Sequence, residues 1–207
     1  LQVVTYDEEL RPSDRQSMTR LFDEVRIAQG LVLQTRKGRK ISNEILLGDV
    51  PVKHITKELG QKYWVRLLDN QNVGLFLDMG HVREWLAQRV KNQKVLNLFA
   101  YTCAFSVSAL ANGARSVVNI DMSKNAIEWG KENHRLNDLD LSMTRMLSHN
   151  IFRSWGKIKQ LGPYGVIIID PPTNQRGSFN AEKHYCQILR RLTQYAEKGA
   201  IIVACLN

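Results

Sequence analysis

The feature that most constrains the fold is a series of short, mostly apolar runs that alternate with helical segments. These runs occupy 95–99, 116–120, 143–147, 166–169 and 200–204. The segments between them that suit helices are 104–111, the stretch that begins at Ser123, 155–161 and 181–197. Short apolar runs of this kind are typical of strands buried on both faces of a parallel sheet. Five such strands alternating with helices predict an α/β fold with a doubly wound parallel sheet in a domain over residues 70–207.

The last apolar run, 200–204, lies next to the end of the sequence, which stops at Asn207. A sheet that ended there would leave an apolar edge uncovered. We therefore expect that C-terminal strands of this domain are missing and that the domain is truncated after its fifth strand.

Residues 1–69 precede the alternating pattern and predict a small α+β region. Two runs, 52–59 and 63–68, flank Gly60-Gln61 and indicate a β-hairpin. From Arg26 to Arg66 there are nine Lys or Arg and three Asp or Glu. The run 36–40 has four cations around Gly38, which suits either a solvated loop or a loop that contacts phosphates. We interpret 1–69 as a basic region that binds RNA.

The composition narrows the class of protein and its partners. The net charge of +9 favours a polyanion, and a nucleic acid above all, as the partner. The three cysteines lie far apart and match neither a disulfide framework nor a zinc-ligand spacing, so we expect no metal. No segment approaches the roughly 20 apolar residues of a membrane span, and no signal-peptide pattern is seen. A reducing cytoplasm is the simplest compartment, and we expect no membrane partner.

The segment 95–105 predicts a ligand-binding turn. A strand that leads directly into a helix presents the free N–H groups of that helix above the strand. In open α/β sheets, ligands bind outside the carboxyl ends of the strands. Asp121 ends the next strand, 22 residues after Phe99, which suits a carboxylate that binds the two hydroxyls of a ribose. The alternative is an aspartate that only caps the following helix.

The absence of glycine from the turn 99–104 separates two classes of cofactor. A dinucleotide needs closely spaced glycines so that the backbone can approach two phosphates. A nicotinamide oxidoreductase is therefore disfavoured, whereas S-adenosylmethionine, which has no phosphate, demands less of the turn.

A second polar turn follows the strand 166–169, where Asp170 precedes Pro171 and Pro172. The prolines fix the backbone and remove N–H donors, which leaves rigid carbonyl groups beside a carboxylate. These acceptors suit the amino edge of a planar base. A turn that merely ends the strand is the alternative.

The motifs VLNLFAYTCAFSVSALANGA, NIDMSKNAIEWGKEN and VIIIDPPT, preceded by GLFLDMGHVREWL, occur in this order. In this, residues 70–207 resemble the class I, Rossmann-like S-adenosylmethionine-dependent methyltransferases that modify large-subunit ribosomal RNA. The similarity is closest to the branch that makes 5-methylcytosine or 7-methylguanine in bacterial 23S RNA. Residues 44–69 resemble the β-hairpin that precedes the catalytic domain in that family, and no counterpart of its N-terminal PUA domain is seen.

The resemblance implies a set of site residues. Around the cofactor it implies Asn97, Phe99 and Ala100 at the methionine, Asp121 at the ribose, Met122, Asn150 and Ile151 at the adenine, and Arg83 at the carboxylate. Asp170 also borders the cofactor and, with Pro171, the point of methyl transfer.

Three positions depart from the family pattern: Cys103 stands in place of a glycine, Gly80 in place of an arginine, and Asn150 in place of an acid. We expect the Cys103 side chain to project where the cofactor approaches the backbone.

Cys205 ends the fifth strand, where the cytosine-5 methyltransferases of this family have their nucleophile. Methylation of that unreactive carbon requires a thiolate to add to the ring first. A cysteine that only packs in the core is the alternative, and methylation of a guanine nitrogen needs no nucleophile.

These observations predict an S-adenosylmethionine-dependent methyltransferase that acts on a base of RNA, with large-subunit ribosomal RNA as the substrate. The competing hypothesis is a catalytically silent RNA-binding protein on the same fold. The sequence leaves the oligomeric state open.

Overall fold

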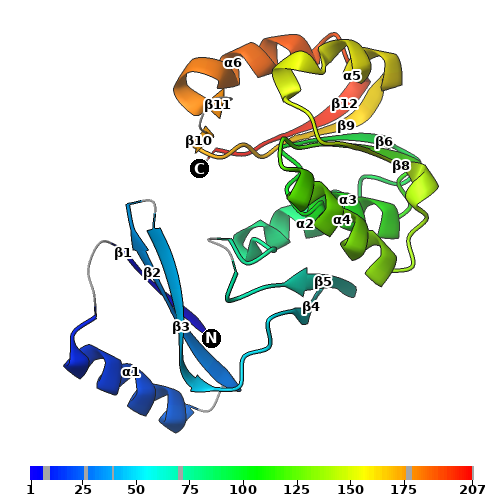
Figure 1. The fold of residues 1–207 in the computed structure, drawn as a ribbon. Helices are drawn as coiled ribbons and strands as arrows, with labels where there is room; N and C mark the ends of the chain where they lie inside the picture. Colours follow the sequence, from blue (N-terminus) through cyan, green and yellow to red (C-terminus); the bar gives the residue numbers. More distant parts are fainter. Residues whose placement is uncertain (7–9, 26–27, 39, 70–71, 176–178, 207) are drawn as a thin grey trace. The chain divides into compact units, whose positions relative to one another are not determined.

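The chain forms two units in a computed structural model, which describes residues 1–6, 10–25, 28–38, 40–69, 72–175 and 179–206. Unit 1 consists of Leu1–Thr56 and Trp64–Leu75. Unit 2 consists of Lys57–Tyr63 and Phe76–Asn207. Figure 1 shows the course of the chain.

Unit 1 is built on a three-stranded sheet with the order β1-β2-β3. Strand β1 (Gln2–Tyr6) runs parallel to β2 (Gly30–Lys37), and β3 (Lys40–Gly48) is antiparallel to β2. Helix α1 (Pro12–Val25) connects the two parallel strands, as a parallel pair requires a long crossover. The core of this sheet is the buried run 31–33 of β2. The predicted α+β character of this region is confirmed.

A β-hairpin follows, formed by β4 (His54–Glu58) and β5 (Gln61–Val65). Leu59 and Gly60 make its two-residue turn with φ of 51° and 83°. Positive φ at both positions is the geometry that matches the twist of the strands in tight hairpins. The predicted hairpin is confirmed.

The core of unit 2 is a five-stranded sheet in which all neighbouring strands are parallel, with the order β12-β9-β6-β7-β8 (Figure 1). Its strands are β6 (Lys94–Leu98), β7 (Ser116–Ile120), β8 (Thr144–Leu147), β9 (Tyr164–Ile169) and β12 (Ala196–Ala204). Strand β6 is central, and the chain adds β7 and β8 on one side and β9 and β12 on the other. This confirms the predicted doubly wound sheet.

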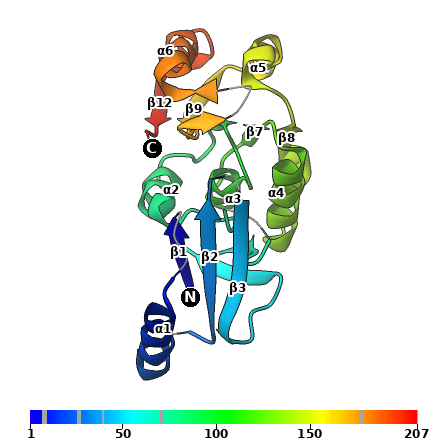
Figure 2. The ribbon, with the colours of Figure 1, turned by 60° about the vertical axis from the view of Figure 1, so that its left-hand side comes forward.

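Helices cover both faces of this sheet, as Figures 1 and 2 show. On one face, α5 (Trp155–Leu161) and α6 (Ala181–Leu192) pack on Leu96, Leu98, Ile167 and Ile169. On the other, α2 (Gly80–Ala87) and α3 (Ala104–Ala111) pack on Val95, Val117, Val166 and Ile168. Helix α4 (Lys124–Leu136) lies beside α3. Alternate strand residues face opposite helical layers, which explains the continuous apolar runs.

Short elements complete the chain: the 3₁₀ helices η1 (Leu77–Met79), η2 (Leu141–Met143) and η3 (Ile151–Arg153), and the paired strands β10 (Asn174–Gln175) and β11 (Phe179–Asn180). No helix in the described part of the chain is both long enough and apolar enough to cross a membrane.

The predicted helix 181–197 is wrong at its C-terminal end, because α6 stops at Leu192. The chain turns at 193–195, where the N–H of Tyr195 bonds to the carbonyl of Leu192 at 2.9 Å. Ala196 then pairs with Tyr164 of β9, so β12 begins before the apolar run does. Pairing with a neighbouring strand overrides the local pattern here.

Candidate active site

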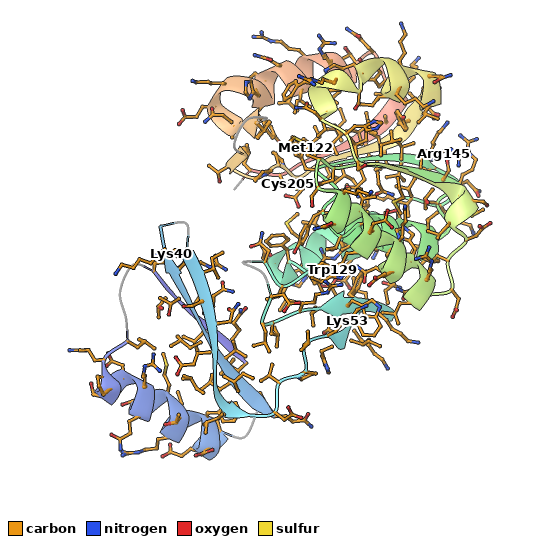
Figure 3. All side chains as sticks on the ribbon, in the orientation of Figure 1. Lys40, Lys53, Met122, Trp129, Arg145 and Cys205 are labelled. Carbon is orange, nitrogen blue, oxygen red and sulfur yellow. The ribbon has the colours of Figure 1, made fainter. Side chains whose placement is uncertain are left out.

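The predicted site residues gather at the carboxyl edge of the sheet in unit 2. Phe99 follows β6, Asp121 follows β7, Asn150 lies three residues after β8, Asp170 follows β9 and Cys205 follows β12. Because all five strands are parallel, these positions share one edge, and Figure 3 labels Met122 and Cys205 there. Strand β6 lies at the topological switch point, which is the usual ligand site of such sheets.

The turn between β6 and α3 has an unusual backbone. Phe99, Tyr101 and Cys103 have φ of 60°, 47° and 61°, in the left-handed region that non-glycine residues avoid. Each such residue costs about 1–2 kcal/mol. The turn is held by hydrogen bonds from the N–H of Ala100 to the carbonyl of Ile120 at 3.0 Å and from the N–H of Cys103 to the carbonyl of Ala100 at 2.7 Å. Strain of this kind collects at functional sites.

Asp121 connects this turn to the next strand. Its Oδ2 accepts a hydrogen bond from the N–H of Tyr101 at 2.9 Å, and its Oδ1 accepts one from the N–H of Ser123 at 2.8 Å. Only 9% of the residue is exposed. Burial raises the pKa of this carboxyl group, and the two N–H donors oppose that shift. Both oxygens are therefore held in place, and each has acceptor capacity left for a ligand hydroxyl.

Cys103 points away from the open edge, so the expectation that its side chain projects toward the cofactor is wrong. The residue is fully buried and packs with Ala100, Ile127 and Met146. A Cβ atom built at Gly130 of α4 would lie 2.5 Å from its Sγ. The missing side chain at position 130 thus makes room for the thiol, whose pKa burial raises. The signal that sequence reasoning missed is this glycine inside a helix.

Asn97 begins a buried polar chain between the sheet, α3 and α4. Its Nδ2 donates to Oδ1 of Asn119, and Nδ2 of Asn119 donates to Oγ of Ser106, both at 2.9 Å. Oγ of Ser106 lies 2.9 Å from Nε2 of His134, and Nδ1 of His134 lies 2.7 Å from the carbonyl of Gly130. A carbonyl only accepts, so Nδ1 carries the hydrogen and Nε2 accepts from Ser106. Burial lowers the pKa of His134, which agrees with a neutral ring.

Asp170 and Cys205 meet at the other side of β6. The Cys205 thiol lies close enough to the Asp170 carboxyl group for each to shift the pKa of the other, and the N–H of Cys205 bonds to the carbonyl of Ile169 at 2.8 Å. Burial and the nearby Asp78 raise the pKa of Asp170. Burial and the Asp170 charge raise the pKa of Cys205 to about 12, so the free site holds a neutral thiol. The Tyr185 hydroxyl donates to the Cys205 carbonyl at 2.8 Å.

Arg83 is enclosed by groups of unit 2. Its Nε and Nη2 donate to the two carboxylate oxygens of Glu58 at 2.6 and 2.7 Å, and Nη2 also donates to the carbonyl of Phe76 at 2.8 Å. Its side chain is 2% exposed. The bidentate pair fixes β4 to α2, and a contact of Arg83 with the cofactor carboxylate stays a prediction.

The residues predicted at the adenine differ in exposure. Met122 is 41% exposed, whereas Ile151 is buried. Oδ1 of Asn150 accepts from the N–H of Phe152 at 2.8 Å and so caps η3. Pro171 is buried directly after Asp170. Their roles toward a ligand stay predictions. Among the described residues, no group of three or more His, Cys, Asp or Glu side chains is arranged to hold a metal ion.

Comparisons with known proteins agree with this geometry. The curated relatives include the ribosomal RNA large subunit methyltransferase K/L of Psychrobacter sp. strain PRwf-1, 35% identical over 156 residues that make up 72% of this chain and 19% of the relative. Another is the ribosomal RNA large subunit methyltransferase I of Aeromonas hydrophila, 32% identical over 162 residues that make up 76% of this chain and 41% of the relative. The chain thus spans less than half the length of these relatives.

Solved structures of methyltransferases superimpose on this chain. A methyltransferase crystallised with SAH superimposes with a TM-score of 0.86 at 26% identity, over 98% of this chain and 55% of that one. The SAM-dependent methyltransferase from Agrobacterium tumefaciens gives a TM-score of 0.74 at 26% identity, over 86% of this chain and 59% of that one. The predicted fold class and the prediction of S-adenosylmethionine as the cofactor are confirmed.

A family model described as S-adenosylmethionine-dependent methyltransferase matches residues 2–207, which is nearly the whole sequence. The chain belongs to the S-adenosylmethionine-dependent methyltransferase family.

Proposed function

We propose that this protein transfers a methyl group from S-adenosylmethionine to a base of large-subunit ribosomal RNA, in the cytoplasm. The observation that carries the proposal is the pair of polar sites on either side of β6. Asp121 and the strained turn lie on one side, and Asp170 with the Cys205 thiol lies on the other. One site suits the methyl donor and the other a base. The relatives named as ribosomal RNA large subunit methyltransferases support the choice of RNA.

On the donor side, Asp121 holds the ribose, because its two oxygens are fixed by backbone N–H groups and still accept hydroxyl hydrogens. Met122, the exposed residue that directly follows Asp121, packs on the adenine. Ala100 and the backbone of the 99–103 turn line the methionine end. The bound cofactor supplies an electrophilic methyl group, and the task of the protein is to align it with the base.

On the base side, we assign C5 of a cytosine as the methylated atom. The Cys205 sulfur forms a bond to C6, and its proton passes to the neighbouring Asp170 carboxylate, whose charge the thiol senses. The raised pKa of Asp170 makes it a better proton acceptor than an ordinary aspartate. Once C5 carries the methyl group, water takes the C5 proton, and the electrons of that C–H bond restore the C5–C6 double bond and break the C6–sulfur bond. The sulfur then regains its proton from Asp170. Pro171 holds the backbone at this point rigid.

Unit 1 and the β4–β5 hairpin also bind the RNA. In the β2–β3 turn, a Cβ atom at Gly38 would meet nothing within 4 Å, so the backbone is open to a large ligand. Lys37 and Lys40 beside it are exposed, and Arg39 lies outside the described residues. Cations on an open loop suit phosphate contacts.

The test is transfer of a labelled methyl group to ribosomal RNA from cells that lack the protein, followed by nucleoside analysis. We expect labelled 5-methylcytosine, and Cys205→Ala removes the signal. Full activity of Cys205→Ala with label in a guanine would replace the cytosine assignment with a 7-methylguanine one. If calorimetry detects no S-adenosylmethionine binding, the protein is a silent RNA binder.

A further inference from the structure

A strongly basic surface lies on the helices that cover one face of the catalytic sheet. We define the α5–α6 basic face as Arg153, Lys157, Lys159, Lys183, Arg190 and Arg191, all of which are exposed. Over 151–195, Glu182 is the one exposed acid among the described residues. The sequence prediction missed this concentration of charge, because it singled out only the excess between Arg26 and Arg66.

One side-chain contact links the two helices that carry most of these cations. The guanidinium of Arg191 in α6 lies 5.3 Å from the ring centre of Trp155 in α5, so the outer sides of the two helices adjoin. Trp155 in turn stacks on Tyr195, with ring centres 5.7 Å apart and the planes at 2°. A cation fixed over a stacked pair of rings is positioned and not freely mobile. Figure 3 shows nitrogen-tipped side chains on the outer side of these helices.

These cations are available to an external anion. In the described part of the chain, none of the six makes a salt bridge, whereas Lys131 of α4 pairs with Glu128 at 2.8 Å. Six like charges raise the energy of the folded chain through mutual repulsion. An anionic partner that spans the helices would remove that cost.

The chemistry of this face separates RNA from a lipid surface. Of the large apolar side chains of α6, Tyr185, Ile188 and Leu192 are buried against the sheet, and Leu189 alone is exposed, at 36%. A helix that binds at a membrane surface must instead present an apolar side to the lipid. Lys183 and Arg191 are eight positions apart, so the helical rise places them about 12 Å apart along α6, a span that covers several nucleotides of a strand.

We propose that the α5–α6 basic face binds the sugar–phosphate backbone of the RNA substrate away from the target base. This inference rests on the proposed function. Lys183 lies in the first turn of α6, and Tyr185, two residues later, donates to the Cys205 carbonyl at 2.8 Å, so the face begins near the site of the base. RNA that enters the site can continue along α6 toward Arg190 and Arg191.

The test is the triple variant Lys157→Gln, Lys183→Gln and Arg190→Gln, which leaves the Arg191–Trp155 contact intact. A matched control removes three exposed cations elsewhere: Lys91→Gln, Arg115→Gln and Arg135→Gln. The probe is a short fluorescent RNA hairpin, titrated into the intact protein at about 50 to 200 mM salt. We expect the triple variant to bind at least about tenfold more weakly and to lose about 2–3 from the slope of log Kd against log salt.

Two further readouts keep this inference separate from the proposed function. S-adenosylmethionine binding by calorimetry should be unchanged in both variants. The α5–α6 inference is overturned if the triple and control variants weaken binding of the RNA hairpin equally, or if the protein binds phosphatidylserine vesicles more strongly than RNA. Neither result would bear on methyl transfer. If the triple variant loses RNA binding as expected but the wild type transfers no methyl group, the RNA-binding role of this face is supported and the proposed enzyme activity is refuted.

Discussion

The sulfur of Cys103 occupies the space that a side chain at position 130 would need. Gly130→Ala therefore tests this packing. Alanine normally stabilises a helix interior by up to about 1 kcal/mol over glycine. Here its Cβ atom would lie 2.5 Å from Sγ of Cys103, so we expect a loss of about 1–3 kcal/mol in the free energy of unfolding. Urea denaturation measures it.

The matched control for this contact is the double variant Cys103→Gly, Gly130→Ala. Removal of the thiol relieves both the overlap and the left-handed backbone at position 103, where φ is 61°. We expect the double variant to recover most of the stability that Gly130→Ala loses. If Gly130→Ala stabilises the protein on its own, the packing described here is incorrect.

The raised pKa of Asp170 predicts how the free energy of unfolding depends on pH. Burial and the charge of Asp78 raise its pKa above the ordinary value of 3.8, so at pH values between the unfolded and the folded pKa the folded state holds a proton that the unfolded state has lost. This contribution is complete below the unfolded pKa and is lost as the pH rises through the folded pKa. We therefore expect the unfolding free energy of the wild type, relative to Asp170→Asn, to fall as the pH rises above about 4. A difference that is constant with pH would contradict the raised pKa.

At the scale of elements, one hydroxyl group of α3 bonds both to β7 and to α4. Ser106 accepts from Asn119 and donates to His134, so Ser106→Ala leaves two buried polar groups without this partner. An unpaired buried group costs about 1–3 kcal/mol, and we expect a loss in that range in urea denaturation.

The same helix contains the control. Ser108 is also buried, and among the described residues its hydroxyl has no hydrogen-bond partner. Ser108→Ala removes an unsatisfied group, so we expect it to be neutral or stabilising. Equal losses from the two variants would mean that volume, and not the hydrogen-bond chain, determines stability here.

The elements of unit 2 were predictable because each has a strong local signal. The apolar runs predicted the strands, and the helix expected from Ser123 is α4, which Ser123 caps through its Oγ, an acceptor for the N–H of Ala126 at 3.2 Å. The end of α6 was not predictable, because residues 193–197 have no breaker and pair with β9 through a contact distant in sequence. The strand β1 was missed for a similar reason, since its pairing with β2 spans 30 residues.

In the candidate site, too, some features were predictable from local sequence and others depend on contacts distant in sequence. The positions of Asp121, Asp170 and Cys205 at one sheet edge follow from strand ends alone. The Arg83–Glu58 pair, the Cys103–Gly130 contact and the chain from Asn97 to His134 do not, because each joins side chains that only the folded structure brings together. A polar residue in a motif can therefore be placed from sequence, while its partners cannot.

At the scale of the whole molecule, the two units have separate cores, and every predicted cofactor residue lies in unit 2. A ligand stabilises only the state that binds it, by about 2.7 kcal/mol at 100 times its dissociation constant. Addition of S-adenosylmethionine at that level should slow hydrogen exchange in β6 and β7 by up to about 100-fold, where exchange requires the unfolding of unit 2. The amides of β2 in unit 1 should change little.

Asp121→Asn supplies the control for that measurement. An amide has one acceptor oxygen, so it cannot accept from both Tyr101 and Ser123 and still bind a ribose through two fixed oxygens. We expect this variant to lose at least about tenfold in cofactor affinity, as for a lost charged hydrogen bond, and to lose the protection of β6 and β7 accordingly. Equal protection of β2 and β6 in the wild type would show that the units unfold together. The separate cores would then act as one cooperative structure, joined through the hairpin whose strands both units share.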